Sequence, residues 1–476
     1  MTTWLIVIGG LWLAMLAVFS LRSYRQTETA HDYIFAGSSV GTVIGLMTFA
    51  ATLFSTFTLM GMPDFFRVNG VGAWIFLAIS DAAMFFLVLG FGFHLRRKAR
   101  ERGYRGVAGL MSDLYGTRWA GYVYFAGVFL FLVPYVAIQV RGIAIFLTAI
   151  FPNALPAWGW STAIVTVMLI YSEIGGLRAI IYSDTLQGTI LLVVIWIIGV
   201  SAIHHFGGVG EMFQEVRAVD PKLLSTPGPQ GLLTFQFLVA SFFAIVMIPV
   251  TQPQVTTRLV IMKNKQKLHR MAVSLGIFTA LILLPIIAIG MYGAVYYGQV
   301  PAREFLSQVL LFEQTDAVGA IVVIGLIAAA VSTSDSQIFA LGTELRSLLS
   351  GKEKRVMFTT RVAVLCFGLA ALIFSIITTD QLVLLARVSF AGTSILGPLV
   401  IAGIFAKRVP GMELIAATGA GLLIFLASLL HLIPDMVGPF RLDLLLLIVL
   451  GVFALVDSLY RTRVAGEAVL GEEEAV

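Results

Sequence analysis

Long apolar runs recur along the whole chain, and short polar segments separate them. A helix needs about 20 apolar residues to cross the hydrocarbon core of a bilayer. Runs of about this length predict thirteen transmembrane helices, at residues 3–21, 38–60, 72–95, 119–150, 157–173, 184–205, 232–251, 271–295, 316–345, 358–378, 381–405, 411–431 and 440–460. The pattern therefore predicts an all-α integral membrane protein with a single transmembrane domain over residues 1–476.

Composition agrees with a membrane protein and excludes a disulfide-rich one. Hydrophobic residues make up 59% and charged residues 12% of the 476 residues, whereas soluble proteins carry about 25% charged residues. The single cysteine, Cys366, excludes a disulfide framework and a cysteine metal cage. No basic segment precedes the first run, so we expect a helix there and not a cleaved signal. The polar stretches are short, so we also expect no attached soluble domain such as a kinase.

The positive charges give the predicted helices an orientation. Cytoplasmic loops of membrane proteins are enriched in lysine and arginine. With the N-terminus outside, 24 of the 31 basic residues fall on the inside, five fall outside, and Arg141 and Arg387 lie within spans. The inside set includes Arg258 and the run from Arg96 to Arg105. We therefore predict an outside N-terminus and a cytoplasmic C-terminus, and we interpret the basic run as a loop at anionic headgroups rather than a nucleic-acid site.

Two predicted helices carry residues that interrupt a helix. The run at 38–60 holds a cluster of serine and threonine residues and is followed by Pro63. The run at 232–251 ends among Pro249 and Pro253. Each proline removes a backbone donor and frees an upstream carbonyl, which is tolerated in a membrane where the backbone lines a cavity.

The two interrupted helices are five apart and run in opposite directions. Many secondary transporters contain two inverted repeats, and their broken helices hold the substrate and ion sites. We predict a 5+5 inverted-repeat core at about residues 38–205 and 232–405, with one extra helix before it and two after it.

Four segments carry a more specific pattern. They are YSEIGGLRAIIYSDTLQ at 171–187, AAAVSTSDSQ at 328–337, DYIFAG at 32–37, and GP followed by GIFAKR within 397–408. In this order and spacing they resemble the motifs of the sodium/solute symporter family, which has the LeuT-type fold. The resemblance implies a sodium-driven importer, since family members are mostly symporters for sugars, amino acids, vitamins and organic acids.

Adjacent hydroxyls at Ser332 and Thr333 indicate a cation site within the membrane. Sodium is a hard cation and prefers oxygen ligands. The resemblance adds three backbone carbonyls to these hydroxyls, those of Ala51, Phe54 and Ala329. The alternative is that the two hydroxyls only help helices to pack.

Two acids near this pair leave the number of sodium ions open. Carboxylates at membrane depth are costly and usually functional. In some family members the aspartate that matches Asp184 joins a second sodium site, which here would consist of Asp184, Ser332, Asp335 and Ser336. In the alternative interpretation, Asp184 only caps a helix at the interface.

Three charges within predicted spans point to the substrate. At 1.5 Å per residue, Asp81, Arg141 and Arg387 lie roughly 10–15 Å below the outer helix ends. Two arginines and one aspartate give this depth of the membrane a net charge of +1, which a single carboxylate on the substrate would neutralise. The planar guanidinium of arginine also suits a carboxylate. We predict a monocarboxylate or other small organic anion; alternatively, Asp81 pairs with Arg141 and Arg387 points to the interface. The polar residues predicted to surround the substrate are Thr56, Thr58, Gln139, Gln252, Ser389 and Thr393.

The sequence thus predicts a sodium-coupled importer in a bacterial inner membrane, which works by alternating access. A neutral or zwitterionic solute, and an uncoupled channel or sensor of the same fold, are the alternatives. No His-Glu-x-x-His, Gly-x-Ser-x-Gly or P-loop motif points to an enzyme. We expect sodium as the cofactor, a small-molecule substrate and the lipid bilayer as partners, no nucleic acid, and a monomer.

One departure from the family is Asp64, which stands where many family members have a glycine. Asp64 is expected to pair with Arg67 or to alter the outer gate.

Overall fold

The structure, a computed structural model, describes residues 1–25, 34–350, 352–378 and 381–473. Within its helices it does not describe the side chains of residues 20, 24, 167–168, 170–176, 353–354, 357 and 463–473. Asp32 and Tyr33 of the 32–37 motif, and the first side chains of the 171–187 motif, therefore lie outside the described residues.

Nearly all of the described chain is helical. The long apolar helices are α1 (Thr2–Arg25), α5 (Trp74–Arg102), α7 (Arg118–Ile150), α8 (Ala157–Phe206), α13 (Lys265–Tyr296), α15 (Asp316–Leu348), α16 (Glu353–Ile377), α17 (Leu382–Ser394) continued by α18 (Gly397–Phe405), α19 (Met412–Leu429) and α20 (Leu442–Glu473). The short helices outside the broken spans are η1 (Ala36–Ser38), η3 (Val71–Ala73), α6 (Val107–Tyr115), α9 (Val209–Val219), η4 (Pro221–Leu224), α14 (Ala302–Ser307) and η5 (Gln308–Phe312). A two-stranded hairpin, β1 (Met436–Val437) and β2 (Phe440–Arg441), joins α19 to α20.

The number of separate spans differs from the predicted thirteen. Among the described residues, ten helices are long and apolar enough to cross a membrane, or eleven with one bent pair. The predicted span at 232–251 is not among them, because its apolar helix, Phe235–Val246, is too short to be counted alone. The runs at 157–173 and 184–205 share the single 50-residue helix α8. The polar segment between them contains no proline, so its backbone can continue the helix.

Both predicted helix interruptions are confirmed. The first broken span consists of α3 (Thr42–Leu53), the π-helical turn η2 (Phe57–Gly61) and α4 (Met62–Asn69), and its halves are bent by 59°. The second consists of α10 (Phe235–Val246), α11 (Ile248–Thr251) and α12 (Pro253–Val260). Phe54 and Gln252 have extended backbone at the two breaks, and Pro253 restarts the second helix at its first position, which proline favours.

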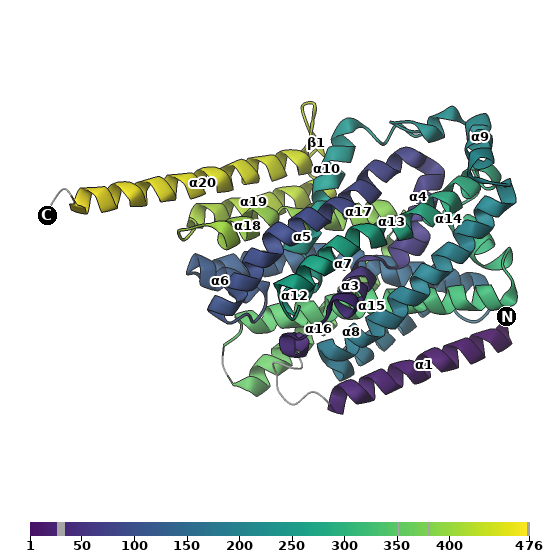
Figure 1. Ribbon diagram of the computed structural model, residues 1–476, viewed down its shortest axis with the longest axis horizontal. Coiled ribbons are helices and arrows are strands. Elements are labelled where there is room, and N and C mark those ends of the chain that lie inside the picture. The colour runs from purple at the N-terminus through teal and green to yellow at the C-terminus, as the bar shows by residue number, and fades with distance from the viewer. Residues whose placement is uncertain (26–33, 351, 379–380, 474–476) are drawn as a thin grey trace.

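The helices differ in how deeply they lie within the bundle. In the most apolar 18-residue stretch of α15, 78% of the stretch is buried, whereas the corresponding share is 12% in α1 and 22% in α20. Figure 1 shows α1 along the outside of the bundle beside α8, and α20 projecting away from it with the C-terminus. The core therefore forms around α15, α7 and the two broken spans, which is where the predicted site residues lie.

Candidate ion and substrate site

The break after α3 frees a carbonyl for the predicted sodium site. In a continuous helix the Ser55 amide would donate to the Ala51 carbonyl, but here it donates to Thr58 Oγ1 at 3.0 Å. The Ala51 carbonyl instead accepts from Ser332 Oγ at 3.4 Å and Thr333 Oγ1 at 3.2 Å. The structure thus brings together three of the five predicted ligand residues.

The other two predicted sodium ligands lie next to this cluster along the chain. Phe54 follows Ala51 by one turn, and Ala329 precedes Ser332 by one turn on α15. Both residues are buried, with 1% and 2% of their surface exposed. Their carbonyls as sodium ligands stay a prediction.

Asp184 of α8 lies at the centre of a buried polar cluster. Its Oδ1 accepts from Ser332 Oγ, and its Oδ2 accepts from Thr48 Oγ1, both at 2.5 Å. Arg258 Nη2 lies 3.3 Å from the same Oδ2 and donates to Ser336 Oγ at 2.6 Å. Asp184 and Arg258 are 0% and 1% exposed at the side chain, so the carboxylate makes a core ion pair rather than an interfacial cap.

Arg258 corrects the charge map drawn from the sequence. The map counts it in a cytoplasmic loop because the apolar run ends at residue 251, whereas the helix resumes at Pro253 and carries Arg258 into the core. Proline at the start of a helix was the available signal. Of the other predicted second-site residues, Ser336 contacts Arg258, and Asp335 is buried with an Oδ1 that has no partner among the described residues.

Two tyrosines of α7, absent from the predicted site, supply donors to the two breaks. Tyr135 donates its hydroxyl to the Leu53 carbonyl, and Tyr124 donates to the Thr251 carbonyl, both at 3.0 Å. Both side chains are buried, and eleven residues, about three turns, separate them, which places them on one helix face. That spacing on a predicted span is the sequence signal that could have found them.

Most of the predicted substrate residues gather near the breaks. Gln139 Oε1 accepts from the Thr56 amide at 3.2 Å, and Gln252 Nε2 donates to Thr393 Oγ1 at 3.4 Å. Thr58 holds the Ser55 amide at the first break. The hydroxyls of Thr56 and Ser389 are buried without a partner among the described residues. They are therefore available to a solute once space opens beside them.

Arg387 occupies a different environment from the predicted one. Its Nη2 pairs with Asp443 at 2.5 Å, its Nε donates to Ser241 Oγ at 2.7 Å, and the guanidinium lies 4.6 Å from the centre of the Phe237 ring. The sequence count of +1 omitted Asp443, although it lies within the predicted span at 440–460. The pair neutralises Arg387, so the count does not hold in the structure.

Arg387 also lines a small central cavity. The cavity lies between η2, α5, α10 and α17, and its volume of about 10 Å³ is close to the size of one water. Its lining residues are Phe57, Phe76, Leu77, Ser241, Ala244, Ile245, Val383, Arg387 and Phe390. An organic solute would need these helices to move apart.

The remaining two intramembrane charges do not pair with each other. Asp81 is 5% exposed, lies one turn from Leu77 on α5, and shares no hydrogen bond with another described residue. Arg141 is half-buried on α7. The described ion pairs do not include one between them.

Comparisons with known proteins identify the family of this chain. The model of the sodium:solute symporter family matches residues 33–420. The chain belongs to the sodium:solute symporter family. The chain is 28% identical to the sodium/pantothenate symporter of Haemophilus influenzae over 304 residues, and the match covers 62% of this chain and 60% of that protein. It is 24% identical over 410 residues to the high-affinity proline transporter PutP of Bacillus subtilis, covering 81% and 84%. The match to the pantothenate symporter thus spans about three fifths of that relative.

A solved structure shows the same fold. The substrate-bound, outward-open state of a Na⁺-coupled sialic acid symporter has a TM-score of 0.77 with this symporter-family chain, at 18% identity, and the match covers 95% of this chain and 96% of that one. MhsT in complex with L-phenylalanine matches more distantly, with a TM-score of 0.54, 16% identity and coverage of 88% and 98%. The LeuT-type fold is therefore confirmed, while the layout of two five-helix repeats stays a prediction.

Charged side chains also link helices near the two ends of this symporter-family protein. On the predicted outer side, Asp64 pairs with Arg67 at 2.7 Å, as expected, and Arg67 Nη1 donates to the Tyr297 carbonyl at 2.7 Å. On the predicted inner side, Arg96 donates to the Val260 carbonyl at 2.7 Å, and Glu344 accepts the first amides of α6. The Arg67 contacts hold the outer half of the first broken span, and the Arg96 contact holds the inner half of the second. The Glu344 contact links α15 to α6.

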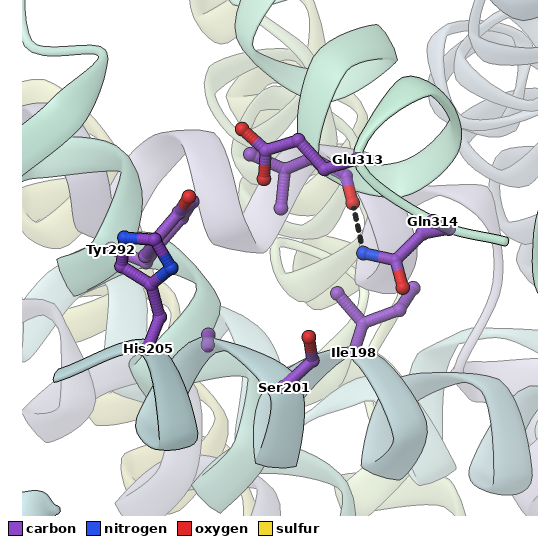
Figure 2. A pocket seen from close by; sticks show the side chains of 8 residues that line it. Ile198, Ser201, His205, Tyr292, Glu313 and Gln314 are labelled. Carbon is purple, nitrogen blue, oxygen red and sulfur yellow. Dashed lines mark hydrogen bonds between the residues drawn. The ribbon is translucent and has the colours of Figure 1, made fainter. Parts of the chain in front are cut away.

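A larger pocket of about 360 Å³ opens between α8, α13 and η5. Figure 2 shows the side chains of Ser201, His205, Tyr292, Glu313 and Gln314 around it. Glu313 accepts the Tyr297 hydroxyl, and burial together with this contact raises the pKa of Tyr297 to about 12. No predicted site residue lines the pocket, so it lies apart from the ion and substrate cluster.

Proposed function

We propose that this protein is a sodium-coupled symporter that imports a small, carboxylate-bearing organic solute by alternating access. The observation that carries the proposal is the convergence of the freed Ala51 carbonyl with the Ser332 and Thr333 hydroxyls. Three hard oxygen atoms from two helices suit sodium, and one of those helices is broken at the ligand. The Phe54 and Ala329 carbonyls, one turn away on each helix, would complete the coordination.

The position of this cluster links sodium to the solute. Ala51 and Thr56 flank the same break, and Thr56 is held by Gln139 of α7. Sodium binding on one side of the break would therefore fix the backbone that faces the solute on the other side. Membership of the sodium:solute symporter family and the names of the relatives support this coupling.

The solute is proposed from the charged side chains within the spans. Arg141 lies half-buried on α7, two residues from Gln139 at the first break, and its guanidinium fork suits a carboxylate. Proline, pantothenate and sialic acid, which appear in the names of the similar proteins, each carry a carboxylate. Asp81, buried without a described partner, favours a solute that also brings an N–H or O–H donor, which extends the monocarboxylate expectation to zwitterions.

The membrane placement completes the proposal. We infer a multi-pass protein of a bacterial inner membrane that acts as a monomer, with the N-terminus outside and the C-terminus in the cytoplasm. Apolar helices and bacterial relatives support the membrane, and the distribution of lysine and arginine supports the orientation.

Uptake into proteoliposomes tests the proposal. Purified protein with an inward sodium gradient is offered labelled proline, pantothenate, sialic acid, lactate, pyruvate, acetate or glucose. We expect uphill uptake of a carboxylate-bearing solute, abolished when sodium is replaced by choline. Equal uptake driven by a proton gradient without sodium would refute sodium coupling, and uptake of glucose alone would refute the carboxylate.

Two variants test which residues bind sodium and which bind the solute. Thr333→Ala should raise the sodium concentration for half-maximal uptake at least about tenfold, equivalent to roughly 1.4 kcal/mol. Thr343→Ala is the matched control, because its hydroxyl donates to the Phe339 carbonyl of the same helix, away from the ion cluster. Arg141→Gln should weaken solute binding without changing sodium binding. Wild-type values in Thr333→Ala would remove Thr333 from the ion site.

A further inference from the structure

Arg258 is a charged side chain that the sodium-driven function does not by itself require. It is 1% exposed, and its three nitrogens contact oxygens from three core helices besides its own. Nε donates to Thr48 Oγ1 of α3 at 3.3 Å, and Nη2 reaches Asp184 of α8 and Ser336 of α15. Nη1 donates to the Gln254 carbonyl at 2.8 Å within α12. Removing such a charge from water is costly, so the site is built to hold a cation.

The atoms that hold this guanidinium overlap the predicted second sodium site. Of its four predicted residues, Asp184 and Ser336 bind Arg258 directly. Ser332 uses its hydroxyl on the other oxygen of Asp184. A sodium ion at the same place would face the guanidinium at contact distance, with both carboxylate oxygens of Asp184 already accepting hydrogen bonds.

The charges of the cluster point the same way. Asp184 and Asp335 bring two negative charges when ionised, and Arg258 brings one positive charge. One sodium ion then makes the cluster neutral, whereas two would leave a buried excess of positive charge. The oxygen that remains unpartnered among the described residues, Asp335 Oδ1, is on α15, one turn from Ser332.

We propose that the Arg258 guanidinium is a tethered cation that takes the place of a second sodium ion between Asp184 and Ser336, so that each transport cycle couples one sodium ion to one solute. The inference rests on the sodium-coupled transport proposed above. Since Arg258 belongs to the second broken span and its partners to α3, α8 and α15, it also ties the two halves of the core together. Ser332 touches both the Ala51 carbonyl and Asp184, so the single sodium ion and the tethered cation share one hydroxyl.

Counting bound sodium tests the inference without knowledge of the solute. The full-length protein in detergent is titrated with ²²Na⁺, and thermal unfolding checks that each variant is folded. We expect about one ion per wild-type chain with a Hill coefficient of about 1, and about two ions in Arg258→Gln with a coefficient that rises toward 2. Three further proteins should each still bind about one sodium ion. They are Arg258→Lys, the double variant Asp184→Asn with Arg258→Gln, and the surface control Arg270→Gln.

The outcomes separate the inference from the proposed function. Two ions per wild-type chain, or one ion in a folded Arg258→Gln protein, overturns the tethered cation. If Arg258→Gln does not fold, two other sodium counts still test the inference: that of the wild type and that of the double variant Asp184→Asn, Arg258→Gln. Two bound sodium ions in either protein would overturn the tethered cation. Absence of both sodium binding and sodium-driven uptake in the wild type would overturn the proposed function itself.

Discussion

Tyr124 and Tyr135 show how single side chains stabilise a broken helix inside a membrane. No water competes for the freed carbonyls there, so each unsatisfied group is costly. The Leu53 and Thr251 carbonyls receive their donors from α7, and the Thr56 amide receives its acceptor from the same helix. At the residue scale, then, hydroxyl and amide groups of α7 hold the breaks open.

Replacing Tyr135 by phenylalanine should expose this dependence. The variant leaves the Leu53 carbonyl buried without its donor, which costs roughly 1–3 kcal/mol. We expect a lower unfolding temperature in detergent and weaker sodium binding. Tyr122→Phe, on the exposed side of the same helix, is the control and should behave as wild type. Equal unfolding temperatures for both variants would contradict the assigned role.

Gly142 sets how closely α7 approaches the first break. A Cβ atom there would lie 2.1 Å from Thr56 Cγ2, so Thr56 would have to move. Overpacking of this kind costs roughly 1–3 kcal/mol, and Gly142→Ala should reduce solute uptake about tenfold or more. Gly90→Ala in α5, with no atom within 4 Å of the added carbon, should retain uptake. Retention of full uptake by both variants would show that Thr56 tolerates the displacement.

At the scale of elements, α15 connects the ion cluster to the predicted cytoplasmic end of the molecule. The helix carries Ser332 and Thr333 in its middle and Glu344 near its end. Glu344 accepts the amides of Val107 and Ala108 at 2.9 and 2.6 Å, so it caps the start of α6. A movement of α15 would therefore pull on α6.

Glu344→Gln should loosen this connection. Glutamine retains one acceptor oxygen and loses the charge, and a hydrogen bond to a charged group contributes about 1.5–3 kcal/mol. We expect lower thermal stability and faster hydrogen exchange at the first amides of α6, measured by mass spectrometry. Glu101→Gln, an exposed residue whose nearest basic nitrogen is 3.9 Å away, should change neither. Unchanged exchange in α6 would mean that the cap is dispensable.

The fold class of the whole molecule could be predicted from the sequence, whereas several contacts of its buried charges could not. Apolar runs and motif spacing led to a LeuT-type membrane fold, and the prolines led to the second broken span, because these signals are local in sequence. The hydroxyls at 332 and 333 carry their chemistry in their side chains and could also be found. Arg258 and the Arg387–Asp443 pair were missed because each depends on a helix boundary or partner that only packing defines.

The orientation of the whole molecule can be tested by labelling. A Cys366→Ser background has no native thiol, and Lys222→Cys and Glu101→Cys add one on each predicted side. A membrane-impermeant maleimide applied to intact cells should label residue 222 and spare residue 101 until the cells are opened. The reverse pattern would place the N-terminus in the cytoplasm and exchange the outer and inner sides assigned to the molecule.

The Arg387–Asp443 pair has a consequence for how this gene can be shortened or fused. The last helix supplies the counter-charge for a buried arginine of α17, and Arg441 adds a second contact to the same carboxylate. A coding sequence cut before codon 443 would leave that arginine without its anion, although every residue matched by the family model ends earlier, at 420. We therefore expect natural variants of this protein to change positions 387 and 443 together.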